Sequence, residues 1–253
     1  MAIDLRDVPK KRQTYAMCLA SVKTNGQQLK YVSTKFQTEE LCLAAITANK
    51  RDADILSYAK VQTPEICMTA VKQNGEALRY VKDQTPELCL EAVKENCFAL
   101  EFVKDQTPEI CLTAIERNGS ALQYVKDQTP ELCLAAVKQD GRALQYIKDQ
   151  TPEICLAAVK QDPYMLERVR EQTPEIRLAA VKRNGMMLQY IPRSKQTLPI
   201  VIAALKRNPD SRKFLADRFR TPKVYKAAGY DYKPEDLASP RRSTKRERTE
   251  PRY

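Results

Sequence analysis

The sequence predicts an all-α fold, an α-solenoid of about nine short helical-hairpin repeats with a basic C-terminal tail. A threonine opens the same motif, Thr-Pro-Glu-(Ile/Leu)-Cys-Leu-x-Ala in its regular form, nine times in 253 residues. From Thr63 to Thr173 the spacing is an unbroken 22 residues, and a fixed period in this range is typical of solenoids. A second apolar run follows each motif. The threonines are Thr14, Thr38, Thr63, Thr85, Thr107, Thr129, Thr151, Thr173 and Thr197.

The repeat that begins at Thr85 illustrates the first helix. Thr85 is suited to accept hydrogen bonds from the free amides of a first turn, and Pro86 fits the first helical position. Glu87 then lies at the positive end of the helix dipole. Leu88 and Val93 mark an apolar face at helical spacing. We therefore expect an α-helix of about ten residues.

A turn and a shorter second helix complete each hairpin. In most repeats the first helix stops at Asn-Gly or Asp-Gly, where we expect glycine to adopt the left-handed conformation that ends helices. The second helix, of about seven residues, covers Ala-Leu-x-Tyr-Val-Lys. One hairpin cannot bury its own apolar stripe, so stacking is required.

Composition divides the chain into four segments. We expect a lead-in over residues 1–12, the solenoid over 13–208, and capping helices over 209–229. The capping segment includes a helix from Asp210 to Arg220 and the first half of a tenth unit from Thr221. Residues 230–253 are polar, charged and interrupted by prolines, and we expect a tail that is disordered or ordered only by a partner.

Seven of the eight cysteines lie four residues after a threonine. Neighbouring repeats would place them roughly 8–10 Å apart, whereas a disulfide requires Cα atoms within about 7 Å. We interpret them as small buried hydrophobes in a reducing, intracellular compartment. Cys97 stands at a glycine position and is expected to be exposed at a turn. The seven are Cys18, Cys42, Cys67, Cys89, Cys111, Cys133 and Cys155.

An aromatic residue recurs seventeen residues after most of the threonines. Packing with the hydroxyl at the rim is the main interpretation. A stacking platform for nucleic-acid bases is the alternative, and it is weakened because flanking residues such as Gln123 and Gln145 are not basic. The aromatic residues are Tyr31, Tyr80, Phe102, Tyr124, Tyr146 and Tyr190.

The composition argues against an enzyme. The chain has no histidine, which excludes Ser-His-Asp and Cys-His pairs and histidine-based zinc sites. All six glycines are assigned to turns, so none is left for a phosphate-binding loop. We predict no catalytic residue, cofactor or metal. The N-terminus carries charges where a signal peptide would be apolar, and no run approaches the ~18 apolar residues of a membrane span.

The repeat is broken most clearly near residue 170. Pro163 replaces the usual glycine, Arg168 stands at the tyrosine position, and Arg177 stands at the cysteine position. Because burying an unpaired arginine is costly, we expect Arg168 and Arg177 to have carboxylate partners or to lie at a locally opened surface. A harmless change of repeat geometry is one interpretation. The other is a protein-binding patch formed with Arg170 and Arg183.

Positive charge concentrates in the C-terminal fifth. Of the net charge of +11, residues 206–253 contribute +8. The basic run in the tail could dock on acidic proteins or bind phosphate backbones through counterion release, or it could simply be solvated. Its basic residues are Arg241, Arg242, Lys245, Arg246 and Arg248.

The unit from Gln128 to Lys148, QTPELCLAAVKQDGRALQYIK, resembles a short repeat family of unknown function that recurs in giant viruses of amoebae and in bacteria that live inside amoebae. The resemblance covers roughly residues 60–190. It implies an all-helical repeat, no catalytic residues to transfer, and a setting in large viral or host-interaction systems. The chain departs from the pattern at Pro163, Arg168 and Arg177.

These features favour a non-enzymatic scaffold that binds other proteins along its faces and anchors through its tail. A minor structural component of a giant-virus particle is the most concrete version. A nucleic-acid-associated protein held by residues 206–253 is the second hypothesis. A host-directed effector that captures a host protein is the third.

Overall fold

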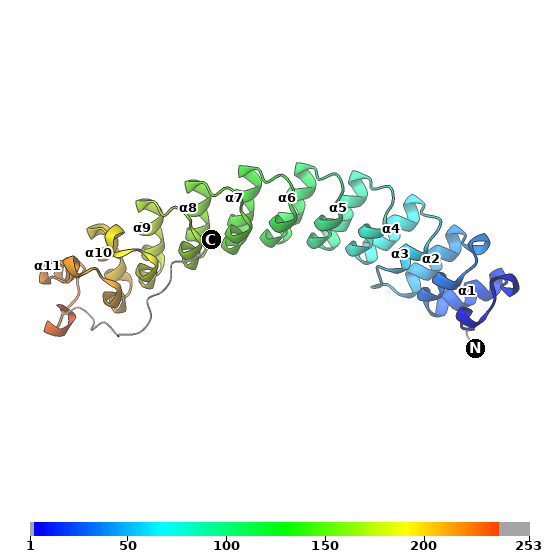
Figure 1. Ribbon diagram of the computed structural model, residues 1–253, viewed down its shortest axis with the longest axis horizontal. Coiled ribbons are helices and arrows are strands. Elements are labelled where there is room, and N and C mark those ends of the chain that lie inside the picture. Colours follow the sequence, from blue (N-terminus) through cyan, green and yellow to red (C-terminus); the bar gives the residue numbers. More distant parts are fainter. Residues whose placement is uncertain (1–2, 238–253) are drawn as a thin grey trace. The chain divides into compact units, whose positions relative to one another are not determined.

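The computed structural model describes residues 3–237, and these residues form helices without a β-strand, which confirms the predicted helical repeat (Figure 1). The α-helices are α1 (Tyr15–Thr24), α2 (Glu39–Ala48), α3 (Ile55–Tyr58), α4 (Pro64–Gln73), α5 (Pro86–Glu95), α6 (Pro108–Arg117), α7 (Pro130–Gln139), α8 (Pro152–Gln161), α9 (Pro174–Arg183), α10 (Leu198–Arg207) and α11 (Pro222–Ala227). Short 3-10 helices lie between them: η1 (Leu5–Asp7), η2 (Lys10–Arg12), η3 (Gly26–Tyr31), η4 (Thr34–Phe36), η5 (Gly75–Tyr80), η6 (Cys97–Phe102), η7 (Gly119–Tyr124), η8 (Gly141–Tyr146), η9 (Pro163–Arg168), η10 (Gly185–Tyr190), η11 (Arg193–Lys195), η12 (Pro209–Phe214), η13 (Asp217–Phe219) and η14 (Pro234–Leu237).

The chain divides into two compact units, Met1–Asp149 and Gln150–Tyr253, here called the N-terminal unit and the C-terminal unit. Each unit has two layers. In the N-terminal unit, α1, α2 and α4 to α7 pack side by side, and a second row alongside them consists of η3, α3 and η5 to η8. The C-terminal unit repeats this arrangement with α8 to α11 and with η9, η10 and η12.

The first helix of each hairpin begins as predicted. In α6 the Thr107 side chain accepts a hydrogen bond from the Ile110 amide at 3.3 Å, and proline occupies the first helical position. The face formed by Ile110, Cys111, Ala114 and Ile115 is buried. This four-residue pattern recurs in the other regular repeats and forms the core of the stack.

In most hairpins the second half differs from the prediction in two ways. It is a six-residue 3-10 helix, and glycine is its first residue rather than a left-handed helix end. Asn118 makes the turn in extended conformation: its amide closes α6, and its side chain accepts from the Ser120 amide at 2.9 Å to start η7. Among residues 3–237, Gly229 is the glycine with positive φ, at 69°.

Close packing explains the recurring glycine. A Cβ atom on Gly119 would lie 2.6 Å from the carbonyl oxygen of Ala136 in the next α-helix, and one on Gly75 would lie 2.4 Å from that of Ala92. The glycine therefore lets one hairpin approach the main chain of the next. Cys97 occupies this position inside the stack. The prediction that Cys97 is exposed is wrong, because its residue is only 9 % exposed.

The seven cysteines at the motif position are buried, as predicted, and all eight are free thiols. The aromatic side chains of the seventeenth position are half-buried at the rim.

The C-terminal end is more completely folded than predicted. The expected helix from Asp210 to Arg220 is instead two 3-10 helices, η12 and η13, separated by an extended link at Leu215 and Ala216. Pro209 opens η12 because its fixed φ suits a helix start. Residues 230–237, assigned to the tail from sequence, return against α11, where the Tyr225 hydroxyl donates to the Asp236 carbonyl at 2.8 Å.

Candidate protein-binding site in the C-terminal unit

A half-buried glutamine joins successive hairpins in the regular repeats. Gln106 Nε2 donates to the carbonyls of Leu100, at 3.2 Å, and Tyr124, at 2.8 Å. Its Oε1 accepts from the Lys126 amide at 2.9 Å and lies 3.8 Å from the Cys111 sulfur. One side-chain amide thus satisfies main-chain groups of two neighbouring hairpins. Equivalent glutamines are Gln62, Gln84, Gln128, Gln150 and Gln172.

Sequence reasoning did not identify this role. The signal was present, because glutamine precedes all nine threonines. Periodicity shows that a residue recurs, but it does not distinguish a linker position from a side-chain amide that bridges two repeats.

The repeat that contains α9 replaces the cysteine beside this glutamine with Arg177. The Arg177 residue is only 7 % exposed. Its Nε and one Nη donate to the Gln172 carbonyl at 3.0 and 2.8 Å, and the other Nη donates to the Lys195 carbonyl at 2.6 Å. Of the two alternatives expected for Arg177, a carboxylate partner is not found among residues 3–237, and the guanidinium is bonded to main-chain carbonyls instead. This repeat is two residues longer than the regular ones, and the extra chain forms η11, which brings the Lys195 carbonyl to the guanidinium.

The glutamine of this repeat also loses its main-chain donor. In regular repeats the donor is the amide twenty residues later, but Gln172 is followed at that distance by Pro192, which has no N–H. The Gln172 Nε2 still donates to Leu166 and Tyr190. Within residues 3–237, Gln172 Oε1 is buried and accepts no hydrogen bond.

These departures surround an open pocket of about 720 Å³, here called the Arg177 pocket. Arg170, Arg177 and Lys195 supply positive charge to its lining, and Glu167 and Glu171 supply negative charge. The rest of the lining is formed by Val169, Gln172, Thr173, Pro174, Tyr190 and Pro192. Two of the four arginines proposed from sequence, Arg170 and Arg177, therefore meet in one hollow.

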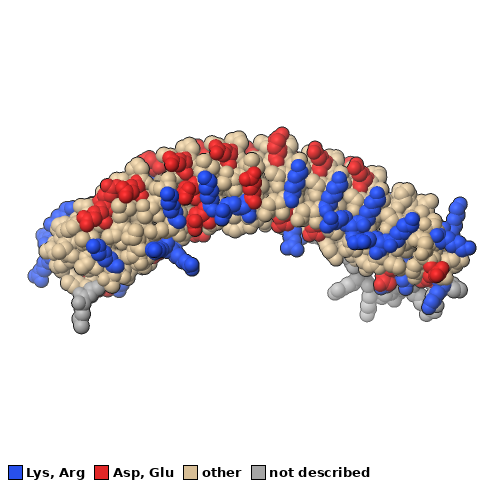
Figure 2. Space-filling model, turned by 180° about the vertical axis from the view of Figure 1, so that it is seen from behind, with Lys and Arg blue, Asp and Glu red and all other residues tan. Residues whose placement is uncertain are grey.

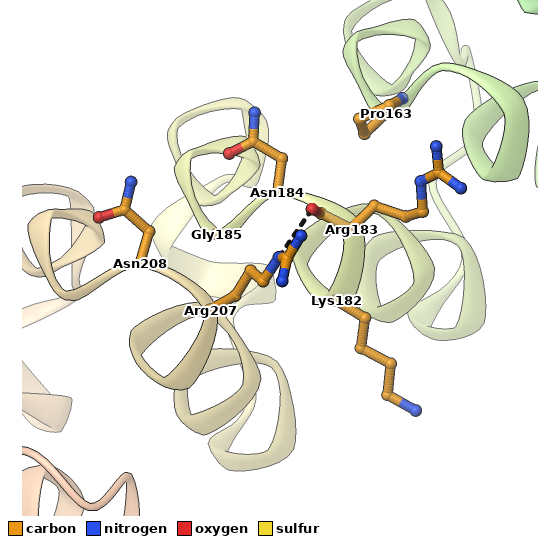
Figure 3. A pocket seen from close by; sticks show the side chains of 7 residues that line it. All are labelled: Pro163, Lys182, Arg183, Asn184, Gly185, Arg207 and Asn208. Atoms are coloured by element: carbon orange, nitrogen blue, oxygen red, sulfur yellow. Dashed lines mark hydrogen bonds between the residues drawn. The ribbon is translucent and has the colours of Figure 1, made fainter.

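A second open pocket, of about 710 Å³, lies at the C-terminal ends of α9 and α10 and is here called the Arg183 pocket (Figure 3). Arg207 Nε donates to the Arg183 carbonyl at 3.1 Å, while the Arg183 side chain extends toward Pro163. Lys182 points away from Pro163 on the same helix. The other described residues that line the Arg183 pocket are Asn184, Gly185 and Asn208. None of the described lining residues is acidic.

Arg168 lines neither pocket. It ends η9, its side chain is exposed, and its carbonyl accepts from Gln150 Nε2 at 3.2 Å. The expectation of an open surface is confirmed there. The structure therefore distributes the four arginines over the two pockets and the adjoining surface of the C-terminal unit. The basic run from Arg241 to Arg248 lies outside the described residues.

One face of the C-terminal unit carries a row of Lys and Arg side chains with acidic side chains at its edges (Figure 2). The sequence explains part of this pattern. At the end of the first helix, the pairs Lys182–Arg183 and Lys206–Arg207 each hold two positive residues. The corresponding pairs of regular repeats hold one, for example Lys138 followed by Gln139.

Neither a metal site nor a reactive thiol is evident among the described cysteine, aspartate and glutamate side chains. Within residues 3–237, no cluster of three or more Cys, Asp or Glu side chains could hold a metal ion. Burial raises the pKa of every motif-position thiol, and that of Cys42 reaches about 11, with a smaller contribution from Glu39. Such thiols are poor nucleophiles near neutral pH. None of the described helices combines the length and apolar character needed to cross a membrane.

Comparison with known families gives matches over five segments, residues 63–107, 85–129, 107–150, 129–172 and 173–220, to the family described as "Domain of unknown function (DUF4116)". The matched segments cover more than half of the chain. The chain belongs to this family. No curated protein and no solved structure matches it significantly.

The family segments also reflect the irregularity of the C-terminal unit. The first four begin 22 residues apart, in step with the repeat, and the fifth begins at residue 173. The repeat that begins at Thr151 and contains Arg168, Arg170 and Gln172 therefore forms the last part of the fourth segment, residues 129–172. The Arg177 pocket spans this junction.

Proposed function

We propose that the chain is a non-enzymatic scaffold that binds other proteins, with a principal docking surface on the C-terminal unit. Membership of a helical repeat family is compatible with this role. The recurring polar residues are occupied with structure: threonines cap helices, glutamines bridge hairpins, and cysteines are buried. These roles support an interaction protein rather than a catalyst.

The observation that carries the proposal is the clustering of departures from the repeat. Arg168, Arg170, Arg177 and Pro192 lie in one part of the C-terminal unit and accompany an open pocket with three cations in its lining. A departure that served geometry alone would not need an exposed arginine such as Arg168. Arginine is frequent among residues that dominate binding energy at protein interfaces.

The more specific version is a minor structural component of a giant-virus particle. Its support is the resemblance of the Gln128–Lys148 unit to repeats that recur in such viruses. Quantitative mass spectrometry of purified particles and of host cytosol tests it. Constant stoichiometry with the major capsid protein supports a particle component, whereas a chain found only free in cytosol supports the host-directed effector.

Site-specific photo-cross-linking tests the docking surface. A photoreactive residue is placed at exposed Arg168 in one variant and at exposed Gln123, in a regular repeat, in a control variant. We expect discrete adducts with one or a few proteins from Arg168 and a weak, diffuse pattern from Gln123. Equal patterns from the two positions would contradict a preferred surface.

The charge distribution favours a second candidate, a nucleic-acid-associated protein, because residues 206–253 carry +8 of the net +11. Binding of a mixed-sequence DNA duplex is measured by fluorescence anisotropy across a salt series, with the full chain and a chain ending at Leu237. Tight, steeply salt-dependent binding that is lost on truncation would support this candidate. Weak binding that is equal for both chains would contradict it.

A further inference from the structure

We propose that the Arg177 pocket binds a carboxylate side chain in an acidic segment of a partner protein. This inference rests on the proposed scaffold function and names the chemistry that its docking surface recognises. Three observations carry it: a buried cation that forms no ion pair with a carboxylate of residues 3–237, a related pocket in a regular repeat that lacks this cation, and a lining of mixed charge.

The Arg177 guanidinium has N–H donors that its hydrogen bonds leave available, and it keeps its positive charge. Its three hydrogen bonds all go to main-chain carbonyls, at 2.6–3.0 Å, and a guanidinium has five N–H donors. Arg177 is almost completely buried, and within residues 3–237 its guanidinium forms hydrogen bonds with main-chain carbonyls rather than an ion pair with a carboxylate. An anion that reaches the pocket meets a guanidinium that is already desolvated and held in place, so little further ordering cost is required.

The regular repeats provide a natural comparison. In the N-terminal unit, a pocket of about 320 Å³ shares part of this lining, with Gln62, Pro64 and Cys67 where the Arg177 pocket has Gln172, Pro174 and Arg177. Its charged lining residues are Asp83 and Glu87, so it would repel an anion. The change to Arg177 and the longer repeat thus replace a small acidic hollow with a larger one that contains three cations.

The mixed lining favours a carboxylate over a phosphate. Glu167 and Glu171 line the pocket together with Arg170, Arg177 and Lys195, which leaves one net positive charge. A carboxylate matches that charge and the planar fork of a guanidinium, whereas a phosphate dianion would also meet two carboxylates. Val169, Pro174 and Pro192 add apolar surface for the methylene groups of a glutamate and the adjoining peptide.

The test measures binding of a fluorescein-labelled peptide of alternating glutamate and glycine to the full-length chain by anisotropy. A peptide with glutamine in place of glutamate is the ligand control. To remove binding by the tail, every protein compared carries glutamine at positions 241, 242, 245, 246 and 248. The main variant is Arg177→Cys, which restores the residue of the regular repeats. Its charge-matched control is Lys138→Gln, which removes an exposed lysine from a regular repeat of the N-terminal unit.

We expect Arg177→Cys to weaken glutamate-peptide binding at least tenfold, Lys195→Gln to weaken it about threefold, and Lys138→Gln to change it less than twofold. Lys195→Gln keeps the test decisive if Arg177→Cys does not fold, since the Lys195 side chain is exposed and only its main chain is used by Arg177. Equal losses for Lys195→Gln and Lys138→Gln would overturn the proposal, as would equal binding of the glutamine peptide.

The experiment must also distinguish a carboxylate ligand from a phosphate ligand. Unlabelled DNA duplex and a phosphothreonine peptide are used as competitors of the glutamate peptide. Weaker competition per charge than that of unlabelled glutamate peptide supports the carboxylate assignment, and stronger competition overturns it. If the glutamate peptide fails to bind while Arg168 still cross-links to a partner, the carboxylate inference is wrong but the scaffold function stands.

Discussion

Gln172 Oε1 accepts no hydrogen bond from the described residues, because Pro192 stands where the regular repeats have a main-chain N–H. In the regular repeat, Gln106 Oε1 accepts from the Lys126 amide at 2.9 Å. The C-terminal unit therefore tolerates an unsatisfied buried acceptor next to the Arg177 pocket. Such a group costs about 1–3 kcal/mol.

Replacing this proline should stabilise the chain. Pro192→Lys restores the missing donor, while the loss of proline rigidity removes about 0.4–1 kcal/mol. We expect a net gain of about 1 kcal/mol in the free energy of unfolding, measured by urea denaturation. The reverse change in the N-terminal unit, Lys126→Pro, leaves Gln106 Oε1 without its amide donor and should destabilise by about 1–3 kcal/mol. A Pro192→Lys variant less stable than the natural chain would contradict this account.

The glycine at the start of each 3-10 helix sets how closely hairpins stack. Gly119→Ala brings a Cβ atom to 2.6 Å from the Ala136 carbonyl oxygen, so the two hairpins must separate. We expect a loss of about 1–3 kcal/mol, as for other overpacked sites, read from thermal melting. Cys97 occupies this position naturally, and Cys97→Gly is therefore the control: it should leave stability within about 1 kcal/mol. An unaffected Gly119→Ala variant would show that stacking is looser than described.

Residues 230–237 should be required for the end of the C-terminal unit. Asp236 forms an ion pair with Arg212 Nε at 2.9 Å, its carbonyl accepts from Tyr225, and Tyr225 is completely buried. A chain that ends at Gly229 should expose this tyrosine and melt several degrees below the full chain. A chain that ends at Leu237 retains these contacts and should melt within about 1 °C of the full chain. Equal melting of the two truncated chains would contradict the role of this segment.

The buried cysteines predict a loss of stability at alkaline pH. Burial raises the pKa of Cys42 from about 9 to about 11, and it raises the pKa of the other motif-position thiols in the same direction. These thiols ionise at a lower pH in the unfolded chain than in the folded chain. Their contribution to the free energy of unfolding is therefore complete below pH 9 and is lost as the pH rises toward 11. Unfolding at pH 8, 10 and 11 should show this decline, and Cys42→Ala should reduce it. Rapid modification of the native thiols at pH 7 would contradict their burial.

The repeat and its first helix could be predicted from sequence because each depends on local signals. Thr107 caps its helix, proline starts it, and Ile110 and Cys111 are buried, all as expected from spacing alone. The role of Gly119 could not be predicted in this way. Its requirement comes from the carbonyl of Ala136 in the next repeat rather than from its own backbone angle.

The candidate site could be located from sequence but not described. Arg168 and Arg177 marked the break in the repeat, since each replaces a recurring residue. The partners of Arg177 are carbonyls supplied by a two-residue extension, and a main-chain partner leaves no signature in the sequence. The effect of Pro192 on Gln172 could not be predicted for the same reason, because the hydrogen-bond donor that proline removes is a main-chain N–H.

The central claim is that the departures in the C-terminal unit form a docking surface for a protein. The most direct measurement is quantitative affinity purification of the natural chain and of a variant that restores the regular residues, with Arg168→Tyr, Arg170→Lys, Arg177→Cys and Arg183→Gln. Thermal melting of both proteins controls for folding. We predict that the variant melts at or above the natural temperature yet recovers its specific partners at least tenfold less efficiently. An unchanged partner profile would contradict the claim.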